Sequence, residues 1–290
     1  MGDATRVIQE VFMKDPAYTI YLVGITLLSL FCFIRGITRS GDPLKTILHS
    51  NGMVRAWEIR WLDALLLTWC MFMAVFAQAL LMAHLLPEGS NWSSILGTLF
   101  MQLCLYGIFF AYQIILPYHH RLPLNTETCN TWKACKSGCY HLLASLPIII
   151  GIAYIWQIVA SLLEQAGIHI NMEEQSFVIQ MIETKSTWAL FCMTGLAVVV
   201  APIVEETIFR GGVYRFFKSR YHRHMAMILS GALFALIHAN IAGFPALLAL
   251  GVALCIAYER TGNIKVPIFM HALFNLNSII IIILQSSTIS

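Results

Sequence analysis

One segment of the chain reads Ala201-Pro202-Ile203-Val204-Glu205-Glu206-Thr207-Ile208-Phe209-Arg210-Gly211-Gly212. It places two adjacent carboxylates and a guanidinium directly after the run at residues 196–200, which is apolar enough to lie in a bilayer. Ionisable side chains at membrane depth cost free energy, so they are rare there and usually have both a partner and a function. The segment therefore predicts a membrane-embedded site built around Glu205 and Glu206.

The spacing of the charges assigns the two acids different surroundings. If residues 202–217 are helical, Glu206 and Arg210 lie one turn apart with the acid N-terminal, the favourable orientation for an ion pair. Neighbouring helical positions point in different directions, so Glu205 faces a cavity between other helices. In an apolar cavity desolvation makes a carboxylate a better base, able to take a proton from water. The alternative is that both acids belong to one buried ion-pair network that fixes helix packing.

The composition is that of a polytopic membrane protein. Of 290 residues, 58% are hydrophobic and 11% are charged, and the mean hydropathy is +0.73, whereas soluble domains carry about 25% charged residues. The eight cysteines are scattered through apolar runs and indicate no disulfide framework. Cys129, Cys135, Cys139 and His141 form a group on a predicted loop, but the group lacks the CxxC spacing of common zinc sites, so free thiols are expected.

The hydropathy pattern predicts an all-α fold of about eight transmembrane helices. The expected spans are residues 17–34, 64–83, 95–116, 142–163, 188–215, 225–239, 247–258 and 266–284. Lysine and arginine concentrate in alternate connections, including Arg215, Lys218, Arg220 and Arg223, which the positive-inside rule places in the cytoplasm. The N-terminus and the C-terminus are then outside. Residues 1–16 are expected to form a short interfacial helix, and the acidic outer segment 164–185 an amphipathic helix on the surface.

Two further pairs of polar or aromatic residues lie at helical spacing in the last third of the chain. Phe234 and His238 share one helix face, and His271 and Asn275 place two hydrogen-bonding side chains one turn apart. By itself a histidine such as His238 is more often a packed residue that bonds a carbonyl than a catalyst. The His271 and Asn275 spacing suits two donors aimed at one oxygen, although such residues also act as polar glue between membrane helices.

Together these residues supply the parts needed for hydrolysis: a base, a group that positions water, and donors for an oxyanion. Counting about 1.5 Å per residue from the cytoplasmic ends puts His271 roughly 10 Å deep, Glu205 about 15 Å and His238 nearer 20 Å. The three side chains can meet only if helices tilt or the sixth span is recessed.

The three motifs resemble those of a known family. Glu205-Glu206 with Arg210 is similar to an EExxxR motif, Phe234 with His238 to FxxxH, and His271 with Asn275 to HxxxN, in that order. This is the CPBP family of intramembrane proteases, which includes type II CAAX prenyl endopeptidases and bacteriocin-processing and self-immunity proteins. The resemblance covers about residues 190–284.

The resemblance implies a role for each motif residue. Glu205 would activate water together with His238, and His271 and Asn275 would stabilise the tetrahedral oxyanion. Glu206, Arg210 and Phe234 would support the site. Members of the family have also been labelled metalloproteases, and Glu205, His238 and His271 are the three ligands that zinc would take. Because no HExxH motif is present and the similar prenyl proteases are glutamate-dependent, no metal or other cofactor is expected.

The sequence thus predicts a membrane endopeptidase in two parts: N-terminal transmembrane helices at 1–186 and a catalytic helical core at 187–290. We expect an integral protein of the bacterial plasma membrane whose partners are the lipid bilayer and a peptide or protein substrate, with no nucleic acid. Prenylated proteins, peptide precursors such as bacteriocin leaders, and membrane proteins remain open as substrates. The alternatives are a proton-coupled transporter and a non-catalytic immunity or scaffold protein, each compatible with buried Glu and His.

Overall fold

The computed structural model describes residues 16–39, 52–85, 91–115, 124–169 and 176–289. Within these ranges the chain is helical and contains no strand. The long helices are α2 (Pro16–Arg39), α4 (Trp61–Leu85), α5 (Asn91–Ile115), α6 (Thr131–Gln165), α12 (Phe244–Thr261) and α13 (Lys265–Ile289). The shorter ones are α7 (Ser176–Glu183), α8 (Thr187–Gly195), α9 (Ala201–Ile208), α10 (Arg215–Lys218) and α11 (Arg223–Ile237). Two π-helical segments, Leu196–Val200 and Phe209–Tyr214, join α8, α9 and α10 into one continuous rod.

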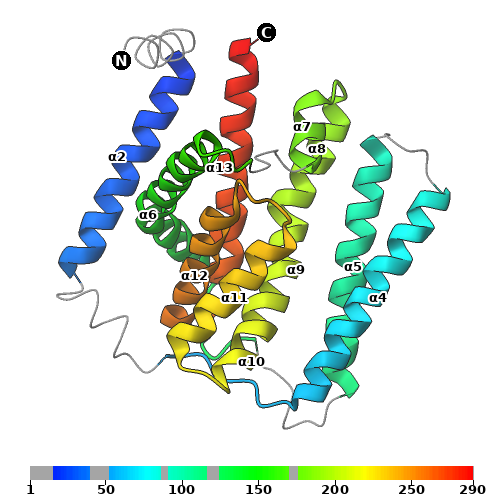
Figure 1. Ribbon diagram of the computed structural model, residues 1–290. Helices are drawn as coiled ribbons and strands as arrows, with labels where there is room; N and C mark the ends of the chain where they lie inside the picture. The colour runs from blue at the N-terminus through cyan, green and yellow to red at the C-terminus, as the bar shows by residue number, and fades with distance from the viewer. Residues whose placement is uncertain (1–15, 40–51, 86–90, 116–123, 170–175, 290) are drawn as a thin grey trace.

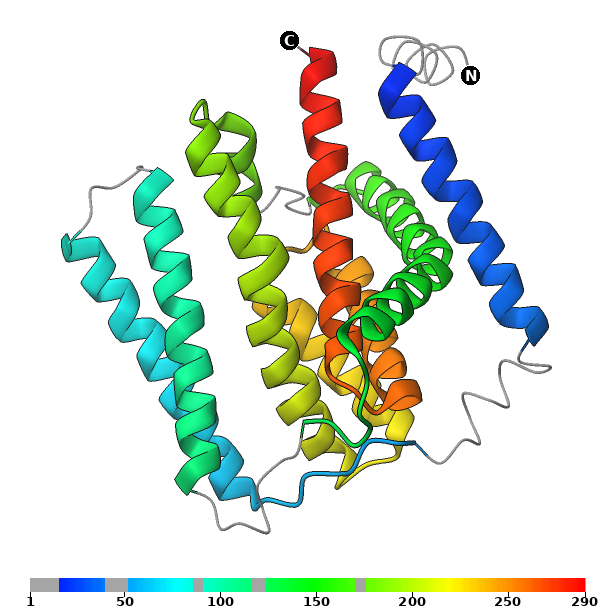
Figure 2. The same ribbon diagram turned by 180° about the vertical axis from the view of Figure 1, so that it is seen from behind.

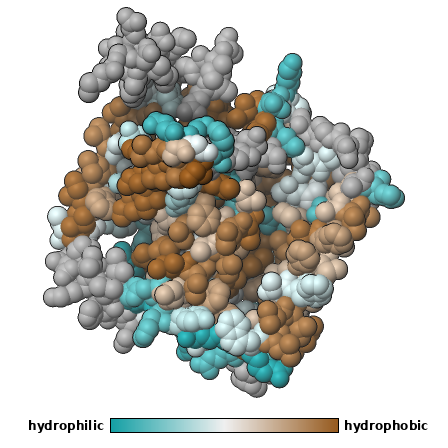
Figure 3. Space-filling model, viewed as in Figure 1, coloured by the Kyte–Doolittle hydropathy of each residue, from teal (hydrophilic) through white to brown (hydrophobic). Residues whose placement is uncertain are grey.

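The prediction of an all-α polytopic membrane protein is confirmed. Seven helical segments in the described ranges are long and apolar enough to cross a membrane, and the rod at Thr187–Lys218 is one of them. Hydrophobic side chains cover much of the surface between two more polar ends (Figure 3). The sixth expected span, at 225–239, is α11, which has only 15 residues. At 1.5 Å per residue it is too short to cross a bilayer, so the recessed sixth span needed for the motifs to meet is present.

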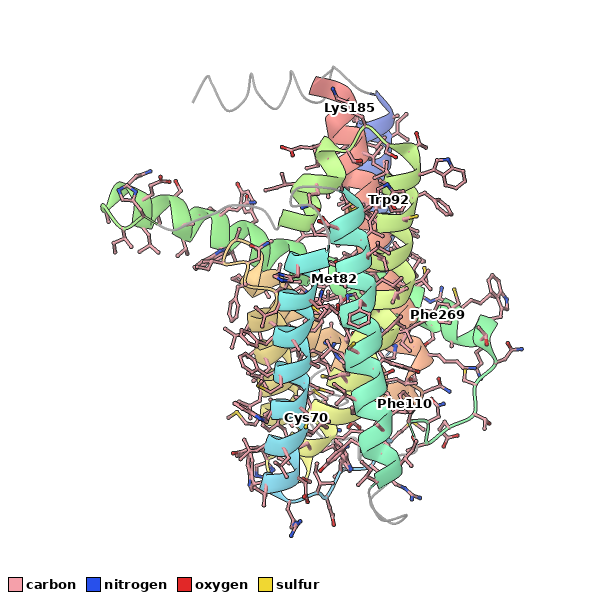
Figure 4. The ribbon with its side chains drawn as sticks, turned by 90° about the vertical axis from the view of Figure 1, so that its right-hand side faces the viewer. Cys70, Met82, Trp92, Phe110, Lys185 and Phe269 are labelled. Atoms are coloured by element: carbon pink, nitrogen blue, oxygen red, sulfur yellow. The ribbon has the colours of Figure 1, made fainter. Side chains whose placement is uncertain are left out.

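The helices form a central group with two flanks (Figures 1 and 2). The rod containing α9 lies in the middle with α11, α12 and α13. The α4–α5 hairpin stands on one side and α2 on the other, where α2 packs on α6. Figure 4 shows α6 running across the long axes of α4 and α5. The start of α2 and the end of α13 lie at one end of the molecule, and the basic α10 lies at the opposite end.

The start of α6 corrects the expected loop at 117–139. Asn130 caps the helix by accepting a hydrogen bond from Trp132 N at 3.0 Å, as a short polar side chain does at an N-terminus. Cys135, Cys139 and His141 therefore lie on a helix. All eight cysteines are free, as expected. In the ranges that the structure covers, no group of three or more His, Cys, Asp or Glu side chains is arranged to hold a metal ion.

Two other expectations concern the outer end. The interfacial helix expected at 1–16 lies outside the described residues, apart from Pro16, which begins α2. In the acidic segment 164–185 the structure describes α7, whose Met181 is buried against Ile95, Met193 and Ile279. This helix is thus anchored to α5, α8 and α13 by an apolar contact.

Residues 52–60 pass beneath the α10 end of the bundle. Trp57 N donates to Arg215 O at 2.9 Å, and Arg215 Nε donates to Arg55 O at 2.6 Å. The Trp57 ring is buried and packs edge-on against Phe109 of α5, with 6.1 Å between ring centroids. A side chain at Gly212 would come within 2.9 Å of Phe109, so glycine is what lets the rod approach α5 here. The helices that carry the site are thereby held together at this end.

Candidate active site

The two acids lie on α9, between the two π-helical segments. At the first of these, Ala201 N bonds to Leu196 O, five residues back, instead of to Ala197 O. The next residue, Pro202, has no N–H to donate, so the helix leaves Ala197 O without an intrahelical donor. Asn275 Nδ2 on α13 donates to that carbonyl at 2.7 Å. Single π-helical turns are rare and often mark functional sites; here one turn creates an acceptor that ties α13 to the rod.

Glu206 is fully buried at the centre of a polar network. Its Oε1 accepts from Arg210 NH1 at 2.8 Å and from His271 Nδ1 at 2.9 Å. Arg210, also 0% exposed, donates through NH2 to Gly251 O at 3.0 Å and lies 4.5 Å from the centre of the Phe234 ring. The pair predicted from the i,i+4 spacing is thus present, and its charge is neutralised within the protein.

The close crossing of α11 and α12 makes this network possible. A Cβ atom added to Gly251 would lie 2.7 Å from Gly231 Cα, so only a glycine fits between the two backbones. Close approach at small residues is a common way for membrane helices to pack. Because of it, the Gly251 carbonyl is within reach of Arg210.

Glu205 lies in different surroundings from its neighbour. Its side chain is 17% exposed, and Oε2 lies 3.9 Å from His238 Nε2 and 3.9 Å from His271 Nε2. Among the described residues no group donates a hydrogen bond to Oε2. The other oxygen, Oε1, accepts from Gln102 Nε2 of α5 at 3.4 Å. The sequence motifs do not include Gln102. The feature of the sequence that could have pointed to it is the occurrence of a polar residue within an apolar span.

Both histidines turn the same ring atom toward Glu205. His238 Nδ1 lies 2.6 Å from Phe234 O, and because a carbonyl only accepts, Nδ1 must be the donor. His271 Nδ1 likewise donates to Glu206. Phe234, fully buried, packs against both rings, with centroid distances of 4.7 Å to His238 and 5.5 Å to His271. With Nδ1 bonded in this way, each Nε2 faces Glu205. In functional histidines the hydrogen bond made by one ring nitrogen commonly fixes the role of the other.

The structure thus brings Glu205, His238 and His271 together, as the sequence requires for a shared site. It places Glu206, Arg210 and Phe234 directly behind them. Asn275 is one turn from His271 on α13, but the two bond to different acceptors: His271 to Glu206 and Asn275 to Ala197 O. The expected pair of donors aimed at one oxygen is therefore not formed by these bonds. The amide of Asn275 retains a second N–H.

Zinc would have to be held by Glu205, His238 and His271. Ligand atoms bound tetrahedrally at about 2.0–2.2 Å lie roughly 3.3–3.6 Å from one another. The two distances of 3.9 Å from Glu205 Oε2 exceed that spacing. As placed, these side chains do not fit a zinc ion.

Comparison with known proteins identifies the segment that carries the site. Residues 187–277 match the family described as type II CAAX prenyl endopeptidase Rce1-like. A Bacillus subtilis protein named "Putative membrane peptidase YdiL" is 32% identical over 77 residues, which are 27% of this chain and 32% of that protein. The "UPF0177 protein YbdI" of Lactococcus lactis is 37% identical over 91 residues, 31% of this chain and 47% of that protein.

The resemblance inferred from the three motifs is therefore confirmed: the segment containing them matches a membrane peptidase family. The chain spans about a third of one relative and about half of the other. No solved structure matches it. Helices α2, α4, α5 and α6 lie outside the matched residues.

Proposed function

We propose that this protein is an intramembrane endopeptidase that uses Glu205 as the base to activate water. The observation that carries the proposal is the convergence of Glu205 Oε2 with Nε2 of His238 and Nε2 of His271, at 3.9 Å each. In the neutral rings both Nε2 atoms are hydrogen-bond acceptors, and a carboxylate oxygen is an acceptor as well. Three acceptors that face one another need a donor between them, and water supplies two O–H groups.

The reaction proposed for this site is addition of water to a peptide carbonyl. Glu205 accepts a proton from the water, and the resulting hydroxide oxygen bonds to the carbonyl carbon while the carbonyl π electrons move to oxygen. His238 orients the water. His271 takes a second proton at Nε2 from solvent when the substrate displaces water from that nitrogen, and it then donates to the oxyanion, as Asn275 does through its second amide hydrogen. This proton returns to solvent when the oxyanion reverts to a carbonyl. The C–N bond then breaks, and Glu205 gives its proton to the leaving amine.

The polar network behind the site supports this role for Glu205. Glu206 is already neutralised by Arg210 and bonded to His271, so it is not available to act as a base. Glu205 has no cation of its own within hydrogen-bonding distance in the described part of the chain. The segment matched to the peptidase family contains all four of these residues.

The substrate class that fits is a peptide segment held at the membrane, such as a lipidated protein or a peptide precursor. The site lies on helices that span the membrane, so a substrate must enter from the bilayer or from the basic end of the bundle. We infer that this end faces the cytoplasm, since Arg215, Lys218, Arg220 and Arg223 lie there. Both ends of the chain are then outside, and the bacterial relatives support the plasma membrane as location.

The direct test compares the peptides produced in membranes that contain the wild-type protein or the Glu205→Gln variant. Glutamine keeps the size of the side chain but cannot accept the proton, so cleavage products present with wild type should fall by at least about 100-fold, the usual contribution of a general base. Glu164→Gln, the same change at an exposed position on α6, is the control and should cleave normally. Repeating the comparison with a chelator shows whether activity depends on a metal.

Wild-type processing by Glu205→Gln, in protein of normal yield and thermal stability, would refute the proposal. His238→Ala provides an independent check, because loss of the imidazole should remove activity without removing the buried Glu206 and Arg210 pair.

A further inference from the structure

Helix α5 contributes a side chain to the site from outside the family segment. Gln102 is 6% exposed, and its Nε2 lies 3.4 Å from Glu205 Oε1. The helix packs against α9 and the preceding π-helical segment, and the matched family segment begins 85 residues later, at residue 187. A buried amide in an apolar span costs free energy unless its polar atoms are bonded.

The hydrogen bonding of Gln102 is one-sided. Its N–H group faces the carboxylate, whereas its Oε1 is buried and has no hydrogen-bond partner among the described residues. A glutamine that served only to join two helices would satisfy both ends on the neighbouring backbone or side chains. An unpaired buried carbonyl beside Glu205 is instead expected where the side chain borders the space in which water or substrate binds.

The two oxygens of Glu205 therefore have separate surroundings. Oε1 is bonded to Gln102, and Oε2 faces both histidines. A carboxylate free to rotate would present either oxygen in several orientations, and only a fixed one keeps the base within reach of the water between the two rings.

Resting on the proposed hydrolytic function, we propose that Gln102 is a positioning residue for Glu205. By donating to Oε1 it fixes the carboxylate so that Oε2 points at His238 and His271. Through this residue the α4–α5 hairpin completes a site whose motifs all lie on other helices.

The test uses the full-length protein and three variants of α5. Gln102→Met keeps the length of the side chain and removes the donor; Gln102→Glu keeps the shape but places a second carboxylate beside Glu205. Gln113→Met is the matched control, since Gln113 is also buried on α5 about three turns away. Thermal unfolding in detergent establishes that each variant is folded.

The first measurement is cleavage of the peptide that distinguishes wild type from Glu205→Gln. Gln102→Met loses one hydrogen bond to a carboxylate, so its kcat should fall by about 10- to 100-fold. Its KM should change by less than about threefold, because the bond acts on the base and not on substrate affinity. Gln102→Glu should be inactive at neutral pH and regain activity at acidic pH, where the introduced carboxyl group is protonated and can donate to Glu205. Gln113→Met should match wild type.

The second measurement does not require a substrate. Dicyclohexylcarbodiimide, an apolar reagent that modifies protonated carboxyl groups, is applied at a series of pH values, and modification of Glu205 is followed by mass spectrometry of peptides. Without the Gln102 donor, Glu205 should be modified faster than in wild type at each pH, because its Oε1 is no longer held by a hydrogen bond, whereas Gln113→Met should leave the profile unchanged. The Glu205→Gln variant identifies the signal.

The outcomes separate the two proposals. If Glu205→Gln is inactive while Gln102→Met retains the wild-type kcat and the wild-type modification profile, the role of Gln102 is wrong and the proposed function stands. If Glu205→Gln cleaves normally, the proposed function fails, and the modification profile alone decides whether Gln102 positions Glu205. An acid-shifted cleavage profile in Gln102→Glu supports the proposal, and one identical to wild type overturns it.

Discussion

The α4–α5 hairpin and the central group of α11, α12 and α13 are both apolar helices, but they are built on different contacts. In the span Trp61–Met82 of α4, 6% of residues in the most apolar stretch are buried, whereas 39% are buried in Phe244–Thr261 of α12. Figure 4 shows Cys70 and Phe110 on the paired helices of the hairpin, at one side of the bundle. The hairpin helices mainly need to be apolar toward lipid, while the central helices need specific shapes and partners.

Ion pairs show the same difference. Arg60 and Asp63, at the start of α4, are 3.0 Å apart, and the arginine side chain is 79% exposed. Arg210 and Glu206 are 2.8 Å apart and both fully buried. An exposed pair contributes little because water solvates each partner, whereas removal of one partner from a buried pair leaves an uncompensated charge. An ion pair between an arginine and a carboxylate therefore contributes little to stability at the edge of the molecule, whereas at its centre neither partner can be removed without a large loss of stability.

The largest expected effect comes from breaking the central pair. Arg210→Met should lower the free energy of unfolding by about 3–5 kcal/mol, because Glu206 would remain buried without its cation. Arg60→Met should leave the free energy of unfolding close to that of the wild type, because water already solvates both partners. The measurement is the yield of monodisperse protein and its thermal unfolding midpoint in detergent. Equal effects of the two substitutions would show that burial does not distinguish the pairs.

The sequence predicted the Glu206 and Arg210 pair because it depends on one helix alone. The i,i+4 spacing is local, and the apolar run before it sets the depth. In the same way, periodicity and hydropathy predicted an all-α membrane fold. Residues 131–139 were wrongly expected to be a loop, since Lys133 and Lys136 lower the hydropathy there although Asn130 is a good N-cap. Local capping chemistry decided the start of the helix.

Contacts between helices were less accessible to sequence reasoning. That Gln102 meets Glu205 follows from how α5 packs on α9, and no spacing within either helix encodes it. The hydrogen bond from Asn275 to Ala197 depends on a π-helical turn that the sequence suggests only through Pro202. His271 was expected beside an oxyanion, and its other ring nitrogen proved to bond to Glu206. The motifs predicted that Glu205, His238 and His271 come together, but they did not predict the hydrogen bonds between different helices.

A smaller difference is expected between two glycines. In Gly251→Ala the new methyl group would meet the Gly231 backbone, with its Cβ 2.7 Å from Gly231 Cα. Separation of α11 from α12 should cost about 1–3 kcal/mol and weaken the bond from Arg210 to Gly251 O. In Gly107→Ala, on α5, the methyl group meets nothing within 4 Å, and the higher helix propensity should stabilise by up to about 1 kcal/mol.

If Gly251→Ala lowers the unfolding midpoint and Gly107→Ala raises it, the contrast between the hairpin and the central helices is supported. Two stabilised proteins would mean that α11 and α12 can separate without penalty.

The π-helical turn offers a narrower test of how the centre is tied together. Asn275→Leu should cost about 1–2 kcal/mol, because Ala197 O loses its donor. In a Pro202→Ala background residue 202 has an N–H that can bond to Ala197 O, so the same Asn275→Leu change should cost about 1 kcal/mol less. The double-mutant cycle measures this coupling. Additive effects would show that the orphaned carbonyl is not what Asn275 stabilises.

The smallest effect concerns the turn that follows His238. Ala239 has a φ of 47°, a left-handed conformation that costs a non-glycine residue roughly 1–2 kcal/mol. Ala239→Gly removes this strain. It also gives the unfolded chain more conformational freedom, which reduces the gain in stability by about 0.5–1 kcal/mol. The net stabilisation should be about 0–1.5 kcal/mol, seen as a small rise in the unfolding midpoint. Since His238 Nδ1 is held by Phe234 O and not by the turn, cleavage should be unchanged; a loss of activity would show that the strained turn itself orients the imidazole.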